Sequence, residues 1–105
     1  MDDRSILAEL KRDYGWLFDE LGLEVIEEHF TERAFGNSFA TLRGKRGLVQ
    51  IVRDRGLRTV ETSARIRSPE WKFLGGDALV LAGDPPQEFV SFDEAMKKVR
   101  AEFQP

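Results

Sequence analysis

Apolar residues recur every three or four positions along the first twenty residues, which is the spacing of one face of an α-helix. The pattern predicts a helix that Asp2 or Asp3 caps and that ends at Gly22, because glycine readily adopts the left-handed conformation that stops a helix. Trp16 falls beside the stripe, so it either lies at the edge of the core or presents an aromatic face to a partner. The stripe consists of Ile6, Leu7, Leu10, Tyr14, Leu17, Phe18 and Leu21.

Beyond Gly22 the pattern changes to the two-residue period of β-strands. It predicts strands over residues 23–30, 37–44, 48–53 and 57–64, and an irregularity in the first where Val25 and Ile26 are adjacent. The links between these segments are too short for parallel crossovers. We therefore expect a four-stranded antiparallel meander.

The turns at residues 44–47 and 55–56 set the register of the meander. They place Leu42 opposite Val49, Ile51 opposite Val60 and Arg53 opposite Arg58. One face of the sheet is then apolar and suits the first helix, with Ala40, Leu42, Val49, Ile51 and Val60. The other face is mixed, with Phe39, Thr41, Arg43, Leu48, Gln50, Val52, Thr59 and Glu61.

The last third of the chain is less regular. Residues 65–90 are predicted to form an irregular linker, broken by Pro69, with a short apolar run near 78–82 that suits either a helical turn or a brief strand. Residues 91–103 predict a helix, since Ser91 and Glu94 match a capping box. The predicted fold is α+β, a single domain over residues 1–105 with a helix on a four-stranded meander, a linker and a C-terminal helix.

Composition narrows the class of protein. The chain has 105 residues, of which 41% are hydrophobic and 33% charged, values typical of one small globular domain. It has no apolar run long enough to cross a bilayer and no secretory signal at residues 1–10, so we expect a cytoplasmic protein with no membrane partner, either a monomer or a homodimer. With no cysteine, thiolate chemistry and zinc-thiolate sites are excluded.

Charge is strongly segregated along the chain. Residues 1–32 carry three basic and ten acidic side chains, whereas residues 33–72 carry ten basic and three acidic ones. These blocks either neutralise each other within the fold or leave the basic hairpins to bind an anion. We expect Arg53 and Arg58 to tie the first helix to the sheet and Arg55 to stay free. The carboxylates expected to compensate the two arginines are Asp13, Asp19, Glu20 and Glu24.

Candidate chemistry is sparse. His29 is the only histidine, and Glu27 shares its face of the strand and is placed to orient the imidazole. One histidine with scattered carboxylates does not match a metal-site spacing, and the glycines match neither a P-loop nor a dinucleotide fingerprint. The serines and threonines have no evident partner base. We expect no catalytic residue, no cofactor and no metal, so the chain is predicted not to be an enzyme.

Three stretches, "DYGWLFDELGLEVIEEHF", "AFGNSFATLRG" and "LVQIVRDRG", resemble a group of small, uncharacterised bacterial proteins. Some of these are similar to immunity proteins of polymorphic toxin systems, which block a partner toxin without catalysing anything. The resemblance spans residues 13–61 and rests on turns and core aromatics. It implies a fold and a protein partner, and no catalytic residues.

The leading functional hypothesis is a non-enzymatic protein-binding module, possible forms of which include an immunity-like protein that blocks a toxin. Aromatic residues beside arginine are typical of interface hot spots. The alternative for the mixed face is that the C-terminal elements cover it to complete the core. The predicted partner-binding residues are Trp16, Phe39, Arg43, Leu48, Val52 and Arg55.

The alternative function is nucleic-acid binding through the two basic hairpins. Arginine and lysine side chains gather there and would contact phosphates. The acidic isoelectric point, about 5.2, and the lack of a base-stacking pattern argue against it. The residues concerned are Arg43, Lys45, Arg46, Arg53, Arg55 and Arg58.

Overall fold

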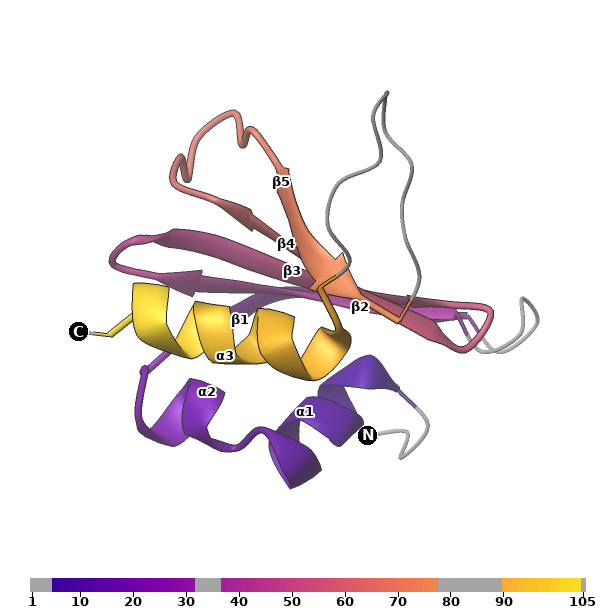
Figure 1. Cartoon of the computed structure of the whole chain (residues 1–105). Helices are drawn as coiled ribbons and strands as arrows, with labels where there is room; N and C mark the ends of the chain where they lie inside the picture. Colours follow the sequence, from indigo (N-terminus) through magenta and orange to yellow (C-terminus); the bar gives the residue numbers. More distant parts are fainter. Residues whose placement is uncertain (1–4, 32–36, 78–89, 105) are drawn as a thin grey trace.

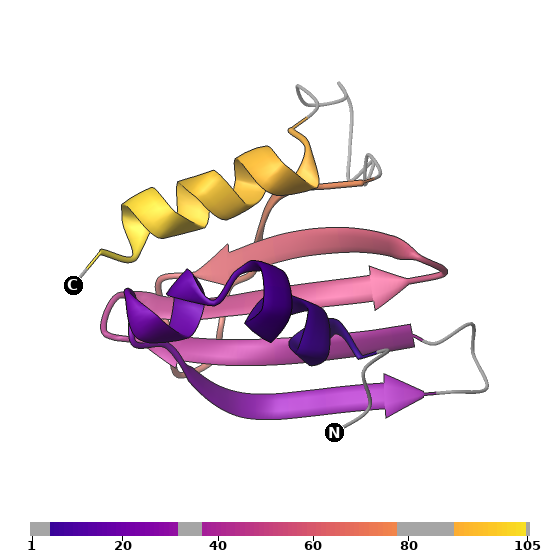
Figure 2. The ribbon, with the colours of Figure 1, turned by 90° about the horizontal axis from the view of Figure 1, so that it is seen from below.

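The protein is a five-stranded antiparallel sheet with its helices on one face, as Figures 1 and 2 show. The computed structural model describes residues 5–31, 37–77 and 90–104. The strands lie in chain order across the sheet, so the fold class is α+β as predicted. The elements are α1 (Ile6–Asp13), α2 (Trp16–Asp19), β1 (Glu24–Thr31), β2 (Asn37–Gly44), β3 (Gly47–Asp54), β4 (Leu57–Ser63), β5 (Lys72–Gly76) and α3 (Phe92–Glu102).

The N-terminal helical segment differs from the single helix that the sequence predicted. It breaks after Asp13, where Tyr14 leaves the helical region with φ −132°. Gly15 follows, and glycine disfavours a continuous helix. Asp2 and Asp3 lie outside the described residues, and the cap of α1 is Ser5, whose Oγ accepts the Ala8 N–H at 3.1 Å.

Gly22 ends the helical segment as predicted. Its φ of +64° lies in the left-handed region, which costs glycine little. The next residue, Leu23, donates its N–H to the carbonyl of Leu17 at 3.0 Å. The chain thereby turns from α2 into β1.

The predicted meander and its register are confirmed. Arg53 pairs with Arg58, Ile51 with Val60 and Leu42 with Val49. The expected irregularity in the first strand is a register shift between Val25 and Glu27.

A fifth strand stands where the sequence predicted only an irregular linker. β5 pairs antiparallel with β4, and glycines at its end permit close approach of other backbone. A Cβ on Gly75 would come within 2.6 Å of the Val90 carbonyl oxygen, and one on Gly76 would collide with the Arg58 carbonyl oxygen. The apolar run at 78–82 lies outside the described residues.

The core fills the space between the sheet and its helices. All five apolar residues predicted for the first face are fully buried there. α3 begins at the predicted cap, since the Ser91 Oγ accepts the Glu94 N–H at 3.2 Å. It packs against β4 and β5 on the same face as α1 (Figure 2), so α3 is not the C-terminal element that covers the mixed face.

Candidate functional site

The sheet face that points away from the helices is called here the second face. Two rows of side chains cross its centre, as the strand register shows, and Arg43 and Leu48 lie opposite each other beyond the second row. In the first row the rings of His29 and Phe39 stack with centroids 5.7 Å apart, and Val52 follows on the neighbouring strand. The first row is His29, Phe39, Val52 and Thr59, and the second is Glu27, Thr41, Gln50, Glu61 and Phe73.

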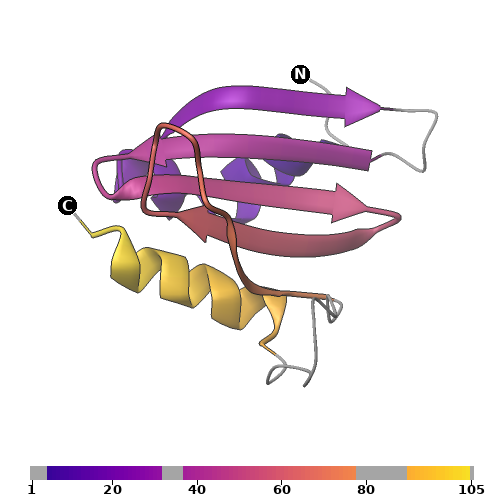
Figure 3. The same cartoon turned by 90° about the horizontal axis from the view of Figure 1, so that it is seen from above.

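The loop of residues 64–71, which joins β4 to β5, rises from the second face, as Figures 1 and 3 show from two directions. Buried Ser63 holds its ends together: its Oγ accepts the N–H groups of Arg65 and Glu70, each at 3.1 Å, and donates to the Arg65 carbonyl at 2.8 Å. Arg65 and Glu70 also form an ion pair at 2.8 Å. The loop is therefore braced from within.

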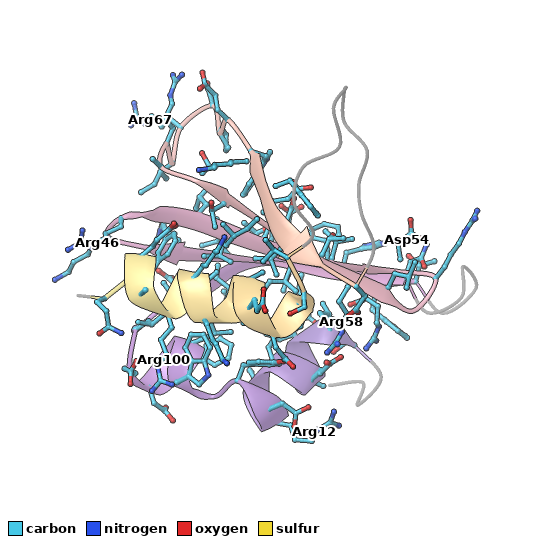
Figure 4. The ribbon with its side chains drawn as sticks, in the orientation of Figure 1. Arg12, Arg46, Asp54, Arg58, Arg67 and Arg100 are labelled. Carbon is cyan, nitrogen blue, oxygen red and sulfur yellow. The ribbon has the colours of Figure 1, made fainter. Side chains whose placement is uncertain are left out.

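The loop exposes apolar side chains beside the second face. Ile66 and Trp71 are both exposed, Trp71 by 38%. Arg67 lies at the outer end of the loop, on the opposite side of the sheet from the helices (Figure 4). The sequence hypothesis assigned no binding role to this segment. The signal that could have indicated such a role is the presence of tryptophan and isoleucine in a loop rich in arginine.

Three of the predicted partner-binding residues lie on the second face and are at least partly exposed to solvent. Phe39 and Val52 are cross-strand neighbours and half-buried. Arg43 is exposed and pairs with Glu24 at 2.8 Å. Leu48, by contrast, is only 2% exposed, because it lies opposite Ser63, where the 64–71 loop begins. Its place among the contact residues is therefore wrong.

The other two predicted residues lie elsewhere. Trp16 lies on the helical side, packed against the core, with its ring edge-on to Tyr14 and the Arg100 guanidinium 5.1 Å from its centroid. Arg55 is exposed at the β3–β4 turn, where its N–H donates to the Asn37 Oδ1 at 2.9 Å. The structure thus makes neighbours of Phe39 and Val52, and it places Arg43 farther along the same face, opposite Leu48.

The basic hairpin forms an ionic link between α1 and the sheet, as predicted. Glu9 accepts from Arg53 at 3.2 Å and from Arg58 at 2.7 Å, and its side chain is only 14% exposed. Asp77 is the second partner of Arg58, at 2.7 Å. None of the four carboxylates named from the sequence forms an ion pair with Arg53 or Arg58 within the described residues: Asp13 pairs with Arg12, Glu20 with Arg100 and Glu24 with Arg43.

Glu9 takes this role because of where α1 begins. The Ile6 N–H donates to the Ser38 Oγ at 3.0 Å, and Ser38 is the β2 neighbour of Arg53. The first turn of α1 therefore lies level with the arginine end of the sheet. The later acidic residues are carried away from it along the helix.

Arg58 is the centre of this cluster (Figure 4). Its hydrogen bonds to Asp77 raise the pKa of Arg58 and lower the pKa of the Asp77 carboxyl. The guanidinium carbon also lies 4.1 Å from the ring centroid of Phe92 in α3. The cluster joins α1, β4 and α3, so it stabilises the fold.

Tyr14 forms a further link between the N-terminal helical segment and α3. Its hydroxyl donates to the Asp93 Oδ1 at 2.6 Å. Burial, and secondarily the hydrogen bond to Asp93, raise the pKa of Tyr14 to about 12. The phenol is therefore held neutral and is not poised for proton transfer near neutral pH.

A cleft of about 520 Å³ opens where the β2–β3 turn, the start of the 64–71 loop and the end of α3 meet. Its charge is mixed, because basic Arg46, Arg65 and Lys72 line it together with acidic Glu70 and Glu102. Arg46 is also engaged, donating from Nε to the Gln104 carbonyl at 2.8 Å. The cleft has no strong preference for an anion or a cation.

Within residues 5–31, 37–77 and 90–104, no group of three or more histidine and acidic side chains is arranged to hold a metal ion. The His29 Nε2 lies 2.6 Å from the Thr31 Oγ1, so threonine, rather than the predicted Glu27, is its hydrogen-bond partner. No helix in the described part of the chain is long and apolar enough to span a membrane.

Comparisons of the chain with protein-family models, with curated proteins and with solved structures found no match.

Proposed function

We propose that this protein is a non-enzymatic protein-binding module that contacts its partner through the second face and the 64–71 loop. The observation that carries the proposal is the one-sided distribution of the helices. All three described helices lie on one face, while half-buried Phe39, Val52 and Phe73 lie on the other, beside exposed Trp71 and Ile66. These five residues are called here the second-face surface.

The second-face surface has the composition of an interface centre. Tryptophan and phenylalanine each bring a large contact area, and truncating such an anchor typically costs about 2 kcal/mol or more of binding free energy. The loop that presents Trp71 is braced by Ser63 and by the Arg65–Glu70 ion pair. A braced loop loses little conformational entropy when it binds, which favours affinity.

The specific form we propose is an immunity-like protein that binds and blocks a toxin. The resemblance over residues 13–61 includes β1, β2, β3 and most of β4, and β2 and β3 supply Phe39 and Val52 of the second-face surface. Blocking by contact needs shape and apolar area and no reacting group. A toxin partner is accordingly a better fit to this chain than a small-molecule substrate.

Nucleic-acid binding is the weaker alternative because most of the hairpin arginines have other partners. Arg43, Arg53 and Arg58 form ion pairs with carboxylates, and Arg46 donates to a backbone carbonyl. An arginine already neutralised by a carboxylate contributes little to phosphate binding. Arg46, Arg55 and Lys45 are the exposed cations of the hairpin turns that form no ion pair within the described residues.

The test is capture of partners from the source cell with three tagged forms of the protein. The wild type is compared with Trp71→Ala, which trims an exposed anchor, and with Lys98→Glu, a control on the exposed side of α3. We expect a protein that the wild type and Lys98→Glu retain and Trp71→Ala loses, with equal melting temperatures for all three. A partner retained equally by all three forms would refute the assignment of the surface.

A further inference from the structure

The second face carries exposed aliphatic side chains at both of its ends. Ile66 is 45% exposed in the 64–71 loop, and Leu57 is 47% exposed at the β3–β4 turn. Leu57 lies opposite Asp54, two residues from Val52, so strand alternation directs its side chain to the second face. Apolar side chains spread in this way over one face typically mark a surface that another protein covers.

Each of these two ends also carries a charged side chain that forms no ion pair within the described residues. They are Arg67 at the outer end of the loop and Asp54 at the β3–β4 turn. Figure 4 shows both on the side of the sheet away from the helices, at opposite ends of the strands. Arg55 follows Asp54 in the turn but does not pair with it, so the carboxylate stays available.

The two ends are therefore complementary to each other. The loop offers Ile66 beside a cation, and the turn offers Leu57 beside an anion. A two-fold axis that lies between two such sheets, perpendicular to their strands, exchanges the two ends. It brings Arg67 of each copy to Asp54 of the other and Ile66 to Leu57, so every contact occurs twice. The strands of the two sheets then run in opposite directions, which suits the aligned packing of sheets face to face.

The extent of the second face is enough for a stable interface. The sheet has five strands, and β1 has eight residues. With strands about 4.8 Å apart and a rise of about 3.3 Å per residue, one face measures roughly 600 Å². Two copies would bury roughly 1,200 Å² before the loops add to it, and stable interfaces begin at about this area.

We infer that the free protein is a homodimer in which the second faces of two copies pack together about this axis. An axis parallel to the strands would set both loops at the same end, with Arg67 of one copy near that of the other and Asp54 unpaired. The inference does not rest on the proposed function, because the free protein alone makes the contact. A partner that binds the second face has to displace the second copy.

The test is sedimentation velocity of the free full chain from micromolar to millimolar concentration, with two charge reversals, Arg67→Asp and Asp54→Arg. A dimer of either variant would contain two contacts between like charges. We expect each reversal to weaken dimerisation about tenfold or more. Both side chains are exposed, so the melting temperatures should equal that of the wild type.

An equal mixture of the two variants tests the contact itself. In a mixed dimer both contacts again join opposite charges, because each variant supplies the charge that the other lacks. We expect the mixture to dimerise with about the affinity of the wild type, although each variant alone dimerises weakly. A folding defect in either variant would not produce this recovery.

Lys98→Glu, on the exposed side of α3, is the control and should dimerise like the wild type. A wild type that stays monomeric throughout, reversals that leave the dimer unchanged, a mixture no stronger than its components, or a dimer lost in Lys98→Glu would each overturn the inference. None of these measurements uses a partner. The inference can therefore fail while capture of a partner succeeds, and the reverse.

Discussion

The ionic link between α1 and the sheet predicts a large effect of removing one carboxylate, in the substitution Glu9→Gln. Glu9 accepts from two arginines that lie directly opposite each other on β3 and β4. Arg58 keeps Asp77 when Glu9 is neutralised, but Arg53 has no other ion-pair partner within the described residues. The substitution therefore leaves one half-buried guanidinium unpaired beside another positive charge.

The magnitude follows from these contacts. A hydrogen bond to a charged group contributes about 1.5–3 kcal/mol, and like charges opposite each other in a sheet cost up to about 1 kcal/mol. Because the cluster is partly exposed and Arg58 keeps one partner, we expect Glu9→Gln to lower the free energy of unfolding by about 2–3 kcal/mol. In a domain of this size that corresponds to a fall in melting temperature of about 10–20 °C.

The assay is urea unfolding monitored by tryptophan fluorescence, with Glu24→Gln as the matched control. Glu24 also pairs with an arginine, but the side chains of Arg43 and Glu24 are 46% and 66% exposed, so its loss should cost less than about 1 kcal/mol. In the double variant Arg53→Gln with Arg58→Gln, adding Glu9→Gln should cost little more, since its partners are gone. If Glu9→Gln were no more destabilising than Glu24→Gln, the structural role of the cluster would be refuted.

Three further predictions concern single positions. Tyr14 is the only tyrosine, so absorbance at alkaline pH should show its ionisation midpoint near 12 in the folded protein and near 10 after denaturation. The free energy of unfolding should therefore fall as pH rises from 10 towards 12. A folded midpoint near 10 would contradict the burial of its hydroxyl. Ser63→Ala should lower the free energy of unfolding by about 1–3 kcal/mol, because it leaves the N–H groups of Arg65 and Glu70 unpaired. Hydrogen exchange at these two amides should accelerate, and unchanged exchange would show that the serine does not brace the loop. Gly47→Ala should destabilise by more than about 2 kcal/mol in thermal unfolding, because φ is +136° and the added Cβ would collide with the Ser63 carbonyl oxygen, whereas a neutral result would place the turn elsewhere.

The central four strands could be predicted because local signals agree along them. Two-residue alternation gave the faces, and the β3–β4 turn, with Arg55 at φ +54° and Gly56 at φ +80°, permits the two-residue hairpin that sets the register. Once the register was known, the opposition of Arg53 and Arg58 followed, as did the need for a carboxylate from α1. The identity of that carboxylate depended on the docking of α1 at Ser38, which no local pattern records.

The errors have physical causes of the same kind. β5 has five residues and ends in two glycines, so it lacks the alternation that marks a strand, and pairing with β4 stabilises it instead. The break at Tyr14 was hidden because the apolar stripe continues across it into α2. Leu48 shares the face of Phe39 by parity, but it is buried opposite Ser63, where the chain leaves the sheet for the 64–71 loop, and strand alternation does not record that loop.

In the function proposed above, the second-face surface binds a protein partner and the arginine cluster only supports the fold. The measurement that tests it most directly is titration calorimetry of the captured partner with Val52→Glu, and with the double variant Arg53→Gln and Arg58→Gln, at a temperature where both are folded. We predict that Val52→Glu weakens binding about 30-fold or more, as expected for a charge buried at an interface centre, and that the double variant binds like the wild type despite its lower melting temperature. Unchanged affinity for Val52→Glu, together with lost affinity for the double variant, would contradict the account and assign binding to the basic hairpin.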